Sequence, residues 1–403
     1  MQQFAYPAYG VAAALATAVS LAGAPAAGPV RWTPHDIDAG FRGGYAVAVA
    51  DFNKDGKPDV MANSLSVNEV AWYENPSWAR HVIVADASQI VNQALADVDG
   101  DGIPEIAFQS GFAMQPGKSE GLTWLARQPG DPRQPWKVER IDAFPTSHHV
   151  VWADLDGDGA LELVNAPLIG PKGQGPTYDQ DKASIFWYSP KDWKRHVITG
   201  DIPGIIHRVR ATKWDGSARD QIVAASFEGI ALYRATGSGA SMTFRKELLT
   251  PGHVEKAPRL GASDVGIGRQ AGRRFFASVE PWHGNEVVVY TEKGGQWQRR
   301  VIFDQVGSGH EIAVLDLNGD RRDDVVANDN SRPSPNNPSA HLGGVHVFYA
   351  PDDAAAGTWQ YQRLDDTAAM NGCVGADIDG DQRPDLVCTG AGGFVRWYEN
   401  RGR

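Results

Sequence analysis

Five short acidic segments have the residue types and the spacing of a cation-binding loop. They read DFNKDGKPD from Asp51, DVDGDGIPE from Asp97, DLDGDGALE from Asp154, DLNGDRRDD from Asp316 and DIDGDQRPD from Asp377. Each has oxygen-bearing side chains at positions one, three, five and nine, and Ca²⁺ prefers such ligands. The candidate calcium ligands are Asp51, Asn53, Asp55, Asp59, Asp97, Asp99, Asp101, Glu105, Asp154, Asp156, Asp158, Glu162, Asp316, Asn318, Asp320, Asp324, Asp377, Asp379, Asp381 and Asp385.

The same pattern has an interpretation without a metal. Asp and Asn also close tight turns by accepting hydrogen bonds from nearby backbone N–H groups. Gly56, Gly102 and Gly159 would allow the turn in the first three loops, whereas Arg321 and Gln382 replace glycine in the last two. Calcium is therefore expected less firmly in the last two loops than in the first three. In either case the loops are structural.

Histidines recur at a fixed distance from these loops. Six residues before the first Asp of each repeat, the sequence predicts the start of a strand that faces a common centre. Eleven histidines in 403 residues make three at this position an improbable accident. In repeat order the position holds Tyr45, Val91, His148, His207, Pro258, His310 and Asn371, where His207 and Pro258 rest on the alignment of two degenerate copies.

Converging imidazoles have two obvious chemical uses. They bind Zn²⁺ or a similar divalent metal, for which we expect His148, His207 and His310 to be the ligands, and an imidazole near neutral pKa is a general base. With a metal or Arg259 to stabilise an enolate, this chemistry suits proton abstraction beside a carbonyl, followed by β-elimination. The candidate catalytic residues are His148, His149, His207, Arg259, His283 and His310; the candidate substrate-binding residues are Asn92, Tyr178, Arg208, Glu280, Asn285 and Asn371. The alternative is that the histidines only form hydrogen bonds around a wet channel.

The elements that must position these residues are short strands. Each acidic loop follows an alternating small-apolar run and precedes a β-type run, and two further strands, one ending and one beginning with an aromatic, complete the repeat. Successive intact loops begin 46 to 61 residues apart where no degenerate copy intervenes. Four strands at this interval predict an all-β fold, a seven-bladed β-propeller of four-stranded antiparallel blades. The last repeat lacks its outer strand, and Val30 to Ile37 is expected to supply it and close the ring, within one domain of residues 29–403.

Composition excludes some partners. A formal net charge of −11 disfavours binding to nucleic acid, and no later run approaches the ~18 apolar residues of a membrane span. Residues 1–28 are apolar and end in small residues, which predicts either an export signal, although it lacks a basic start, or a disordered tail. We therefore expect a secreted or periplasmic monomer. Cys373 and Cys388 flank one predicted hairpin, so they form either one cross-strand disulfide or two buried free thiols.

The acidic loops resemble the FG-GAP or VCBS repeats of integrin-type and secreted bacterial propellers. The segments TSHHVVWADLDGDG, GIIHRVRATK, FFASVEPWHGNEVVVYTE and GSGHEIAVLDLNGDRRDDVV also resemble the propeller domain of the fungal aldos-2-ulose dehydratase/isomerase family, and they are similar in style to propeller-fold lyases of uronic-acid glycans. The resemblance implies that His148, His207, His283 and His310 line an active site with metal assistance. That family carries cupin domains after its propeller, so an isomerase step assigned to cupins is not implied here.

Two functions from different classes follow. The first is a lyase or dehydratase that performs metal-assisted β-elimination on a keto-sugar or uronic-acid glycan. The second is a carbohydrate-binding or adhesion propeller without catalysis; the concentration of unusual residues in repeats three to six favours one site over seven. A calcium-stabilised scaffold would leave the histidine positions unexplained. No Gly-x-Ser-x-Gly elbow or phosphate-binding glycine motif is present, which disfavours a serine hydrolase or nucleotide use.

Overall fold

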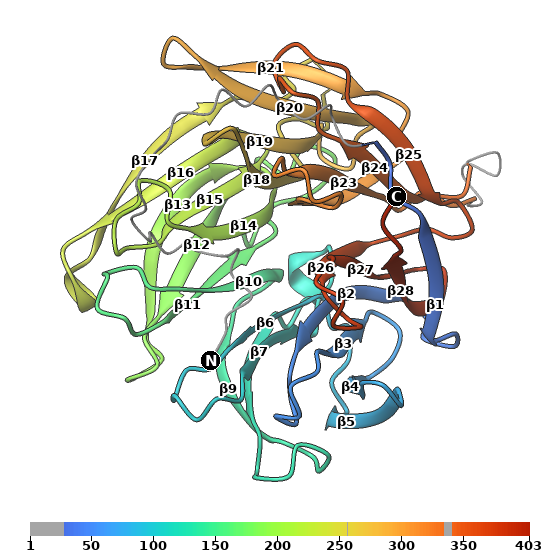
Figure 1. The fold of residues 1–403 in the computed structure, drawn as a ribbon. Coiled ribbons are helices and arrows are strands. Elements are labelled where there is room, and N and C mark those ends of the chain that lie inside the picture. Colours follow the sequence, from blue (N-terminus) through green and yellow to red (C-terminus); the bar gives the residue numbers. More distant parts are fainter. Residues whose placement is uncertain (1–27, 256, 334–340) are drawn as a thin grey trace, which may run out of the picture.

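A computed structural model describes residues 28–255, 257–333 and 341–403 of the chain. The segment predicted to be an export signal or tail, residues 1–28, lies outside the described residues except for Gly28. The described residues form seven four-stranded sheets arranged around a central axis (Figure 1). The predicted seven-bladed propeller is confirmed.

The blades follow the chain in order, each from the innermost to the outermost strand. Blade 1 comprises β2 (Gly44–Ala50), β3 (Asp59–Ser64), β4 (Glu69–Glu74) and β5 (Ala79–Ala85). Blade 2 comprises β6 (Asn92–Ala96), β7 (Glu105–Ser110), β8 (Leu122–Arg127) and β9 (Lys137–Ala143). Blade 3 comprises β10 (Ser147–Ala153), β11 (Glu162–Pro167), β12 (Lys182–Tyr188) and β13 (Arg195–Pro203). Blade 4 comprises β14 (Ile206–Thr212), β15 (Gln221–Ser226), β16 (Gly229–Thr236) and β17 (Thr243–Thr250).

The second half of the ring continues the pattern. Blade 5 comprises β18 (Asp264–Gln270), β19 (Arg273–Glu280), β20 (Glu286–Lys293) and β21 (Gln296–Phe303). Blade 6 comprises β22 (Gly309–Leu315), β23 (Asp324–Asp329), β24 (Gly344–Tyr349) and β25 (Gln360–Asp365). Blade 7 comprises β26 (Gly372–Ala376), β27 (Asp385–Gly390), β28 (Phe394–Asn400) and, as its outermost strand, β1 (Trp32–Asp38).

Apolar side chains between neighbouring blades hold the ring together. Seven buried clusters fill the seven blade interfaces, and each draws side chains from two adjacent sheets. The second strands are buried on both faces, which is why runs such as DVMANS and DLVCTG are almost continuously apolar or small. Burial of this kind stabilises by roughly 25 cal/mol per Å² of apolar surface removed from water.

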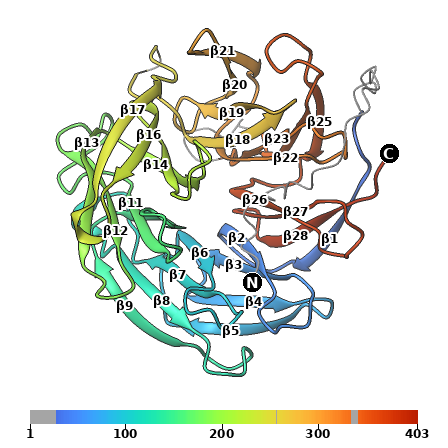
Figure 2. The same cartoon turned by 60° about the vertical axis from the view of Figure 1, so that its left-hand side comes forward.

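Strand β1 closes the ring as the sequence predicts. It pairs antiparallel with β28, with Trp32 opposite Asn400 and His35 opposite Trp397 (Figure 2). The His35 ring stacks on Trp397 with centroids 4.6 Å apart, and its Nε2 lies 2.8 Å from Glu399. The two ends of the chain therefore share one sheet.

Blade 5 differs from the predicted alignment. Its innermost strand begins at Asp264, so Pro258 lies in the preceding loop and does not occupy the histidine position. The reason is the turn between β18 and β19, which is only Ala271 and Gly272, both with positive φ, where each of the other blades has an eight-residue loop. Without such a loop, counting back from it misplaced the strand.

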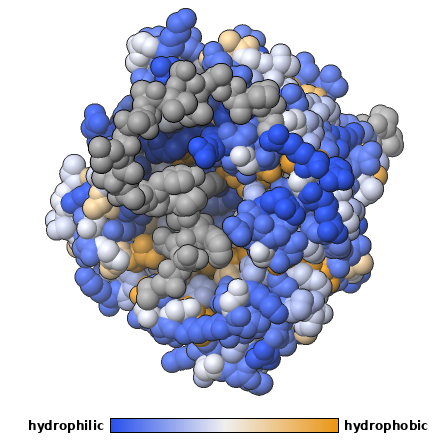
Figure 3. Space-filling view, viewed as in Figure 1, coloured by the Kyte–Doolittle hydropathy of each residue, from blue (hydrophilic) through white to orange (hydrophobic). Residues whose placement is uncertain are grey.

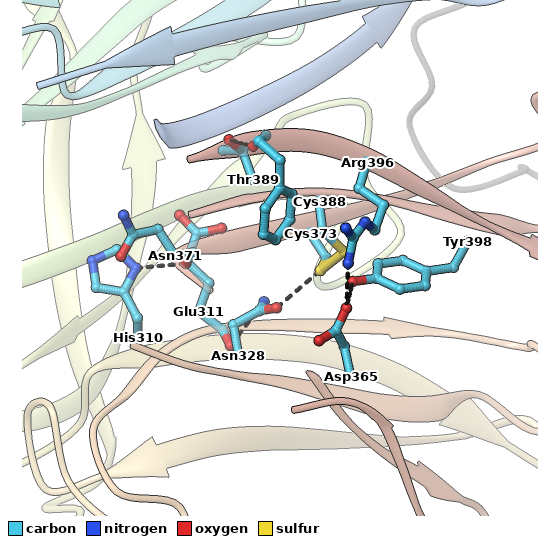
Figure 4. The surroundings of a disulfide bond; sticks show 11 residues. His310, Glu311, Asn328, Asp365, Asn371, Cys373, Cys388, Thr389, Arg396 and Tyr398 are labelled. Carbon is cyan, nitrogen blue, oxygen red and sulfur yellow. Dashed lines mark hydrogen bonds and ion pairs between the residues drawn. A yellow bond between two sulfur atoms is a disulfide. The ribbon is translucent and has the colours of Figure 1, made fainter. Parts of the chain in front are cut away.

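The two cysteines are bonded to each other. Cys373 and Cys388 lie directly opposite on β26 and β27, with Cα atoms 4.2 Å apart, and form a disulfide (Figure 4). Cys373 is two residues from Asn371, whose backbone oxygen accepts a hydrogen bond from His310. Of the two alternatives for these cysteines, the structure has the bridge.

Removal of this disulfide should lower the free energy of unfolding. A bridge spanning 15 residues is expected to contribute about 3 kcal/mol by restricting the unfolded chain. Urea unfolding of a Cys373→Ser, Cys388→Ser variant, beside the oxidised protein, should show a loss of that size. The same denaturation midpoint for both would show that the bridge contributes nothing.

The described residues contain two short 3-10 helices, η1 (Pro116–Lys118) and η2 (Gly239–Ser241), and no helix among them is long and apolar enough to cross a bilayer. On the face of the molecule shown in Figure 3, the described residues are mainly hydrophilic, and apolar residues are exposed in small patches.

Candidate active site and metal centres

Three histidines from three parts of the chain meet at one mouth of the channel. His207 and His310 are the second residues of β14 and β22, and His283 comes from the loop between β19 and β20. One ring nitrogen of each lies within 4.8 Å of a ring nitrogen of the others. The Nε2 atoms of His207 and His283 are 3.2 Å apart. This spacing fits the first coordination shell of a single divalent ion.

Backbone carbonyls orient two of these rings. Nδ1 of His207 lies 2.9 Å from the oxygen of Ser263, and Nδ1 of His310 lies 2.7 Å from the oxygen of Asn371. A carbonyl oxygen only accepts hydrogen bonds, so each Nδ1 carries the proton. Each Nε2 then keeps its lone pair, and this is the tautomer that ligates a metal.

His148 stands beside this cluster and is linked to it by Tyr45. The Tyr45 hydroxyl lies 2.8 Å from Nε2 of His148 and 3.2 Å from Nε2 of His310. The His148 ring centroid is 5.1 Å from that of His207. The predicted convergence of His148, His207 and His310 is therefore present, but the three ligand atoms that gather most closely are those of His207, His283 and His310.

The four imidazoles are held in the neutral form. Burial lowers the pKa of His148 to about 3, with the neighbouring His310 and Arg208 adding to the effect. Burial is also the main cause of the lowered pKa of His207, His283 and His310. Neutral rings present lone pairs at neutral pH, which both metal binding and proton abstraction require.

A buried ionic network lies directly behind the histidines. Arg208 donates to Nε2 of His149 at 2.5 Å, has its Nε 3.3 Å from Asp264, and forms an ion pair with Glu311. Asp264 also accepts from Arg210 at 2.9 Å. These residues come from the innermost strands of blades 3, 4, 5 and 6, so the network ties together the strands that carry His148, His207 and His310.

Other predicted site residues lie at the mouth or near it. Arg259 is exposed, donates to the backbone oxygen of His283 at 3.1 Å, and has its guanidinium 5.8 Å from the centroid of the Trp282 ring. The Tyr178 ring is 6.1 Å from the same indole. Asn371 donates from its side chain to the backbone oxygen of Gly44 at 2.6 Å, and its buried Oδ1 has no hydrogen-bond partner among the residues that the structure describes.

Three predicted substrate-binding residues form hydrogen bonds within the fold. Glu280 is fully buried within blade 5, where it accepts from Tyr290 at 2.7 Å and from Arg299 at 2.8 Å. Asn92 accepts from the backbone N–H of Val150 at 3.0 Å, between blades 2 and 3. Asn285 donates to the backbone oxygen of Asp304 at 2.8 Å.

The sequence pattern did not identify Tyr45 as a site residue. Its place at the histidine position of blade 1 could have indicated that it lies at the same mouth of the channel. Nothing in the sequence favoured His283 over His148 as a metal ligand, because the position of a loop residue cannot be predicted by counting along strands. In the structure His283 has a φ of 48° and follows the cis bond between Glu280 and Pro281.

The acidic loops lie at the other end of the innermost strands. Carboxylate oxygens gather within 4.8 Å of one another at Asp97, Asp99 and Asp101, at Asp154, Asp156 and Asp158, and at Asp377, Asp379 and Asp385. The first Asp of each loop also accepts backbone N–H bonds, as from Gly56 to Asp51 at 2.9 Å. The two interpretations of the loops are thus compatible, since turn closure leaves further carboxylate oxygens for an ion.

The ninth position has a constant structural partner. Asp59, Glu105, Glu162, Asp324 and Asp385 each accept the backbone N–H of the second loop residue, at 2.7 to 3.0 Å. In blades 6 and 7 an arginine also binds the fifth position, as Arg322 does with Asp320 at 2.8 Å and Arg383 does with Asp381. An internal cation thus competes with calcium directly at the fifth position of the last two loops. In blade 3 Lys213 lies 3.8 Å from Asp154, a longer contact, so the three-carboxylate clusters of blades 2 and 3 are the best candidates.

Calcium should stabilise the protein most at and above neutral pH. Burial raises the pKa of Glu162 in blade 3 to about 7 and also raises the pKa of Glu105 in blade 2, so the calcium-free fold keeps protons that the unfolded chain loses above about pH 4. Stability without calcium therefore falls as pH rises from about 4 to about 7. Calcium at a hundred times its Kd should restore about 2.7 kcal/mol per site.

Thermal melts with calcium or EDTA at pH 5 and pH 8 measure this effect. Asp99→Asn and Asp156→Asn should remove most of the increment, whereas Asp131→Asn, an exposed aspartate outside the loops, should leave it intact. A calcium effect that is larger at pH 5 than at pH 8 would contradict the expectation.

Comparison with known proteins agrees with the fold and the loops. Residues 120–293 match the family described as aldos-2-ulose dehydratase, beta-propeller domain, and residues 51–108 match the FG-GAP-like repeat. Aldos-2-ulose dehydratase of Phanerodontia chrysosporium is 25% identical over 391 residues, which cover 85% of this chain and 40% of that protein. The chain thus spans less than half the length of this curated relative.

Solved structures share the fold at low identity. BBS1N in complex with ARL6DN has a TM-score of 0.54 at 13% identity, covering 92% of this chain and 97% of that one. The Dos1 propeller has a TM-score of 0.51 at 10% identity, covering 92% and 96%. The chain is a seven-bladed β-propeller with FG-GAP-like repeats that resembles the β-propeller domain of aldos-2-ulose dehydratase.

Proposed function

We propose that this chain is a carbohydrate-active lyase or dehydratase that performs β-elimination at the histidine-rich mouth. The observation that carries the proposal is the grouping of His207, His283 and His310, with His148 and Tyr45 beside them. The similarity to aldos-2-ulose dehydratase supports a carbohydrate substrate, and the matched residues 120–293 include His148, His207 and His283.

The donor set fits zinc or a similar divalent ion. His207, His283 and His310 would hold it through Nε2, leaving a fourth position open for a substrate oxygen, as catalytic zinc sites do. Such an ion would supply a Lewis acid that polarises a carbonyl or carboxyl group. Calcium would occupy the acidic loops as a structural ion.

The chain's own residues can move the proton. His148, unprotonated at neutral pH, accepts the proton from the carbon next to the carbonyl. The pair of electrons left behind forms the carbon–carbon double bond as the bond to the β-oxygen breaks. Burial raises the pKa of Tyr45, so its hydroxyl stays protonated and can donate to the departing oxygen, while His148 re-protonates it across their hydrogen bond. Arg259 would hold the developing enolate oxygen.

Incubation with keto-sugars and uronic-acid glycans tests the proposal. The unsaturated product absorbs in the ultraviolet, and its formation should stop in His148→Ala and His310→Ala. If the metal-bound protein forms no product from any of these substrates, the proposed enzymatic function is wrong.

A binding function without catalysis has one observation in its favour. Two grooves between blades each have two tryptophans in their lining, one of them largely buried. Trp78 and Trp397 line one of about 340 Å³ between blades 7 and 1, and Trp124 and Trp136 line one of about 390 Å³ between blades 1 and 2. Tryptophan-lined grooves suit sugar rings. Binding that survives loss of the channel histidines but not Trp124→Ala would favour this function.

Export and a monomeric state complete the proposal. The bond between Cys373 and Cys388 supports a secreted or periplasmic location, because such bonds persist in oxidising compartments. Pairing of β1 with β28 completes the last blade, and the short outer edges of propeller blades offer little for a second copy to pair with, which supports a monomer.

A further inference from the structure

An aromatic half-rim surrounds the candidate active site on one side. Its members are Phe112, Tyr178, Phe227 and Trp282, and each lies in the loop between the second and third strands of its own blade, in blades 2, 3, 4 and 5 respectively. They pack with buried residues such as Leu168 and Ile205 in an apolar cluster formed by these mouth loops. The seven other clusters lie between blades, so this one has a different origin.

The half-rim touches the histidines directly. The Phe112 ring is 5.2 Å from the ring of His148, and the Trp282 ring is 4.8 Å from His283 and 6.5 Å from His207. Phe227, almost fully buried, supports Trp282 from behind at 5.7 Å. Phe112, Tyr178 and Trp282 remain partly exposed at the mouth.

The corresponding loops of blades 7 and 1 contain no aromatic residue; they read AGG and LSVN. A ligand at the histidines therefore meets aromatic rings on the side of blades 2 to 5, and a charged group lies beside those rings. Arg259, next to Trp282, uses Nη1 in its one hydrogen bond within the described chain, so other N–H groups can reach a ligand oxygen.

We propose that the half-rim is a subsite for one closed pyranose ring, which stacks an apolar face on Trp282 and places its edge against Tyr178, whose ring is nearly perpendicular to the indole. This inference rests on the proposed function, and it adds what orients the substrate. A pyranose has faces of C–H groups that pack on aromatic rings, whereas its hydroxyls point outward, where Arg259 can donate to them. Stacking one face fixes which C–H bond points toward His148.

Two substitutions separate binding from chemistry. Trp282→Leu should raise KM for the eliminated sugar about tenfold and change kcat less than about threefold, since it removes stacking and not the reacting groups. Trp282→Phe keeps a ring and should recover most of the loss. The matched control is Tyr361→Leu, which removes an exposed ring from the outer strand β25 and should leave KM unchanged. Metal content should be the same in all variants.

Calorimetry on the EDTA-treated protein tests the subsite without turnover. The probes are methyl β-glucopyranoside, methyl β-glucuronopyranoside and the open-chain alditol glucitol. Both pyranosides should bind, glucitol should not, and Trp282→Leu should weaken binding about tenfold. Equal binding of glucitol, or an unchanged KM in Trp282→Leu, overturns the subsite even if elimination occurs. Pyranoside binding lost in Trp282→Leu, without elimination by the unaltered protein, upholds the subsite and removes the proposed enzyme.

Discussion

Zinc bound to the purified protein should fall from about one equivalent to background when His207 and His310 are both replaced by alanine. Their Nε2 lone pairs are set by hydrogen bonds from Nδ1 to Ser263 and Asn371, so no other tautomer competes. A site left with His283 alone cannot hold a divalent ion tightly. Any elimination activity should fall at least about a hundredfold with the metal.

Elemental analysis after dialysis measures this directly. His81→Ala and His196→Ala are matched controls, because those histidines stack on Trp72 and Trp187 on outer strands, away from the channel. His148→Ala should keep the metal and lose the activity. Full metal retention in the double variant would show that these imidazoles are not ligands.

Arg208→Met should lower the free energy of unfolding by about 3–5 kcal/mol. The side chain of Arg208 is only 9% exposed, and its removal leaves the partly buried Glu311 carboxylate without its cation and the fully buried Asp264 with Arg210 alone. A methionine fills similar volume, so the loss measures unpaired charge and not a cavity. Because the network spaces the strands that carry the histidines, metal affinity should fall as well.

Urea denaturation with and without zinc measures both effects. Arg127→Met is the comparison: its pair with Glu139 is more than a third exposed on each side and should contribute less than about 1 kcal/mol. A loss from Arg208→Met as small as that from Arg127→Met would mean that the network does not stabilise the ring.

The sequence predicted the ring well because its evidence is repeated. Five loops share one spacing, and seven strands end in an aromatic residue. All of them predict the same four-stranded unit, so the prediction does not depend on any single copy. Closure by β1 was predictable because the last repeat lacked a strand and the first residues supplied one. The predicted alignment of blade 5 was wrong because this blade lacks the acidic loop and has a two-residue turn after Gln270 in its place.

The site was predictable only where it lies on strands. His148, His207 and His310 share a strand position, and the structure brings them together as expected. His283 depends on the path of a loop, which spacing does not determine. The burial of Glu280 depends on its partners Tyr290 and Arg299, which lie on later strands of the same blade and which no local pattern marks.

The closing blade has a consequence for the order of folding during synthesis. His35 and Glu399 are partners, yet 364 positions separate them. Blades 1 to 6 are each made of consecutive strands and can form as they leave the ribosome, but blade 7 cannot be completed until β28 has emerged. Until then β1 has no partner, and the nascent protein exposes one unpaired strand and the two open blade surfaces that blade 7 will cover. At this stage it is most open to capture by chaperones or to mispairing with a neighbouring chain.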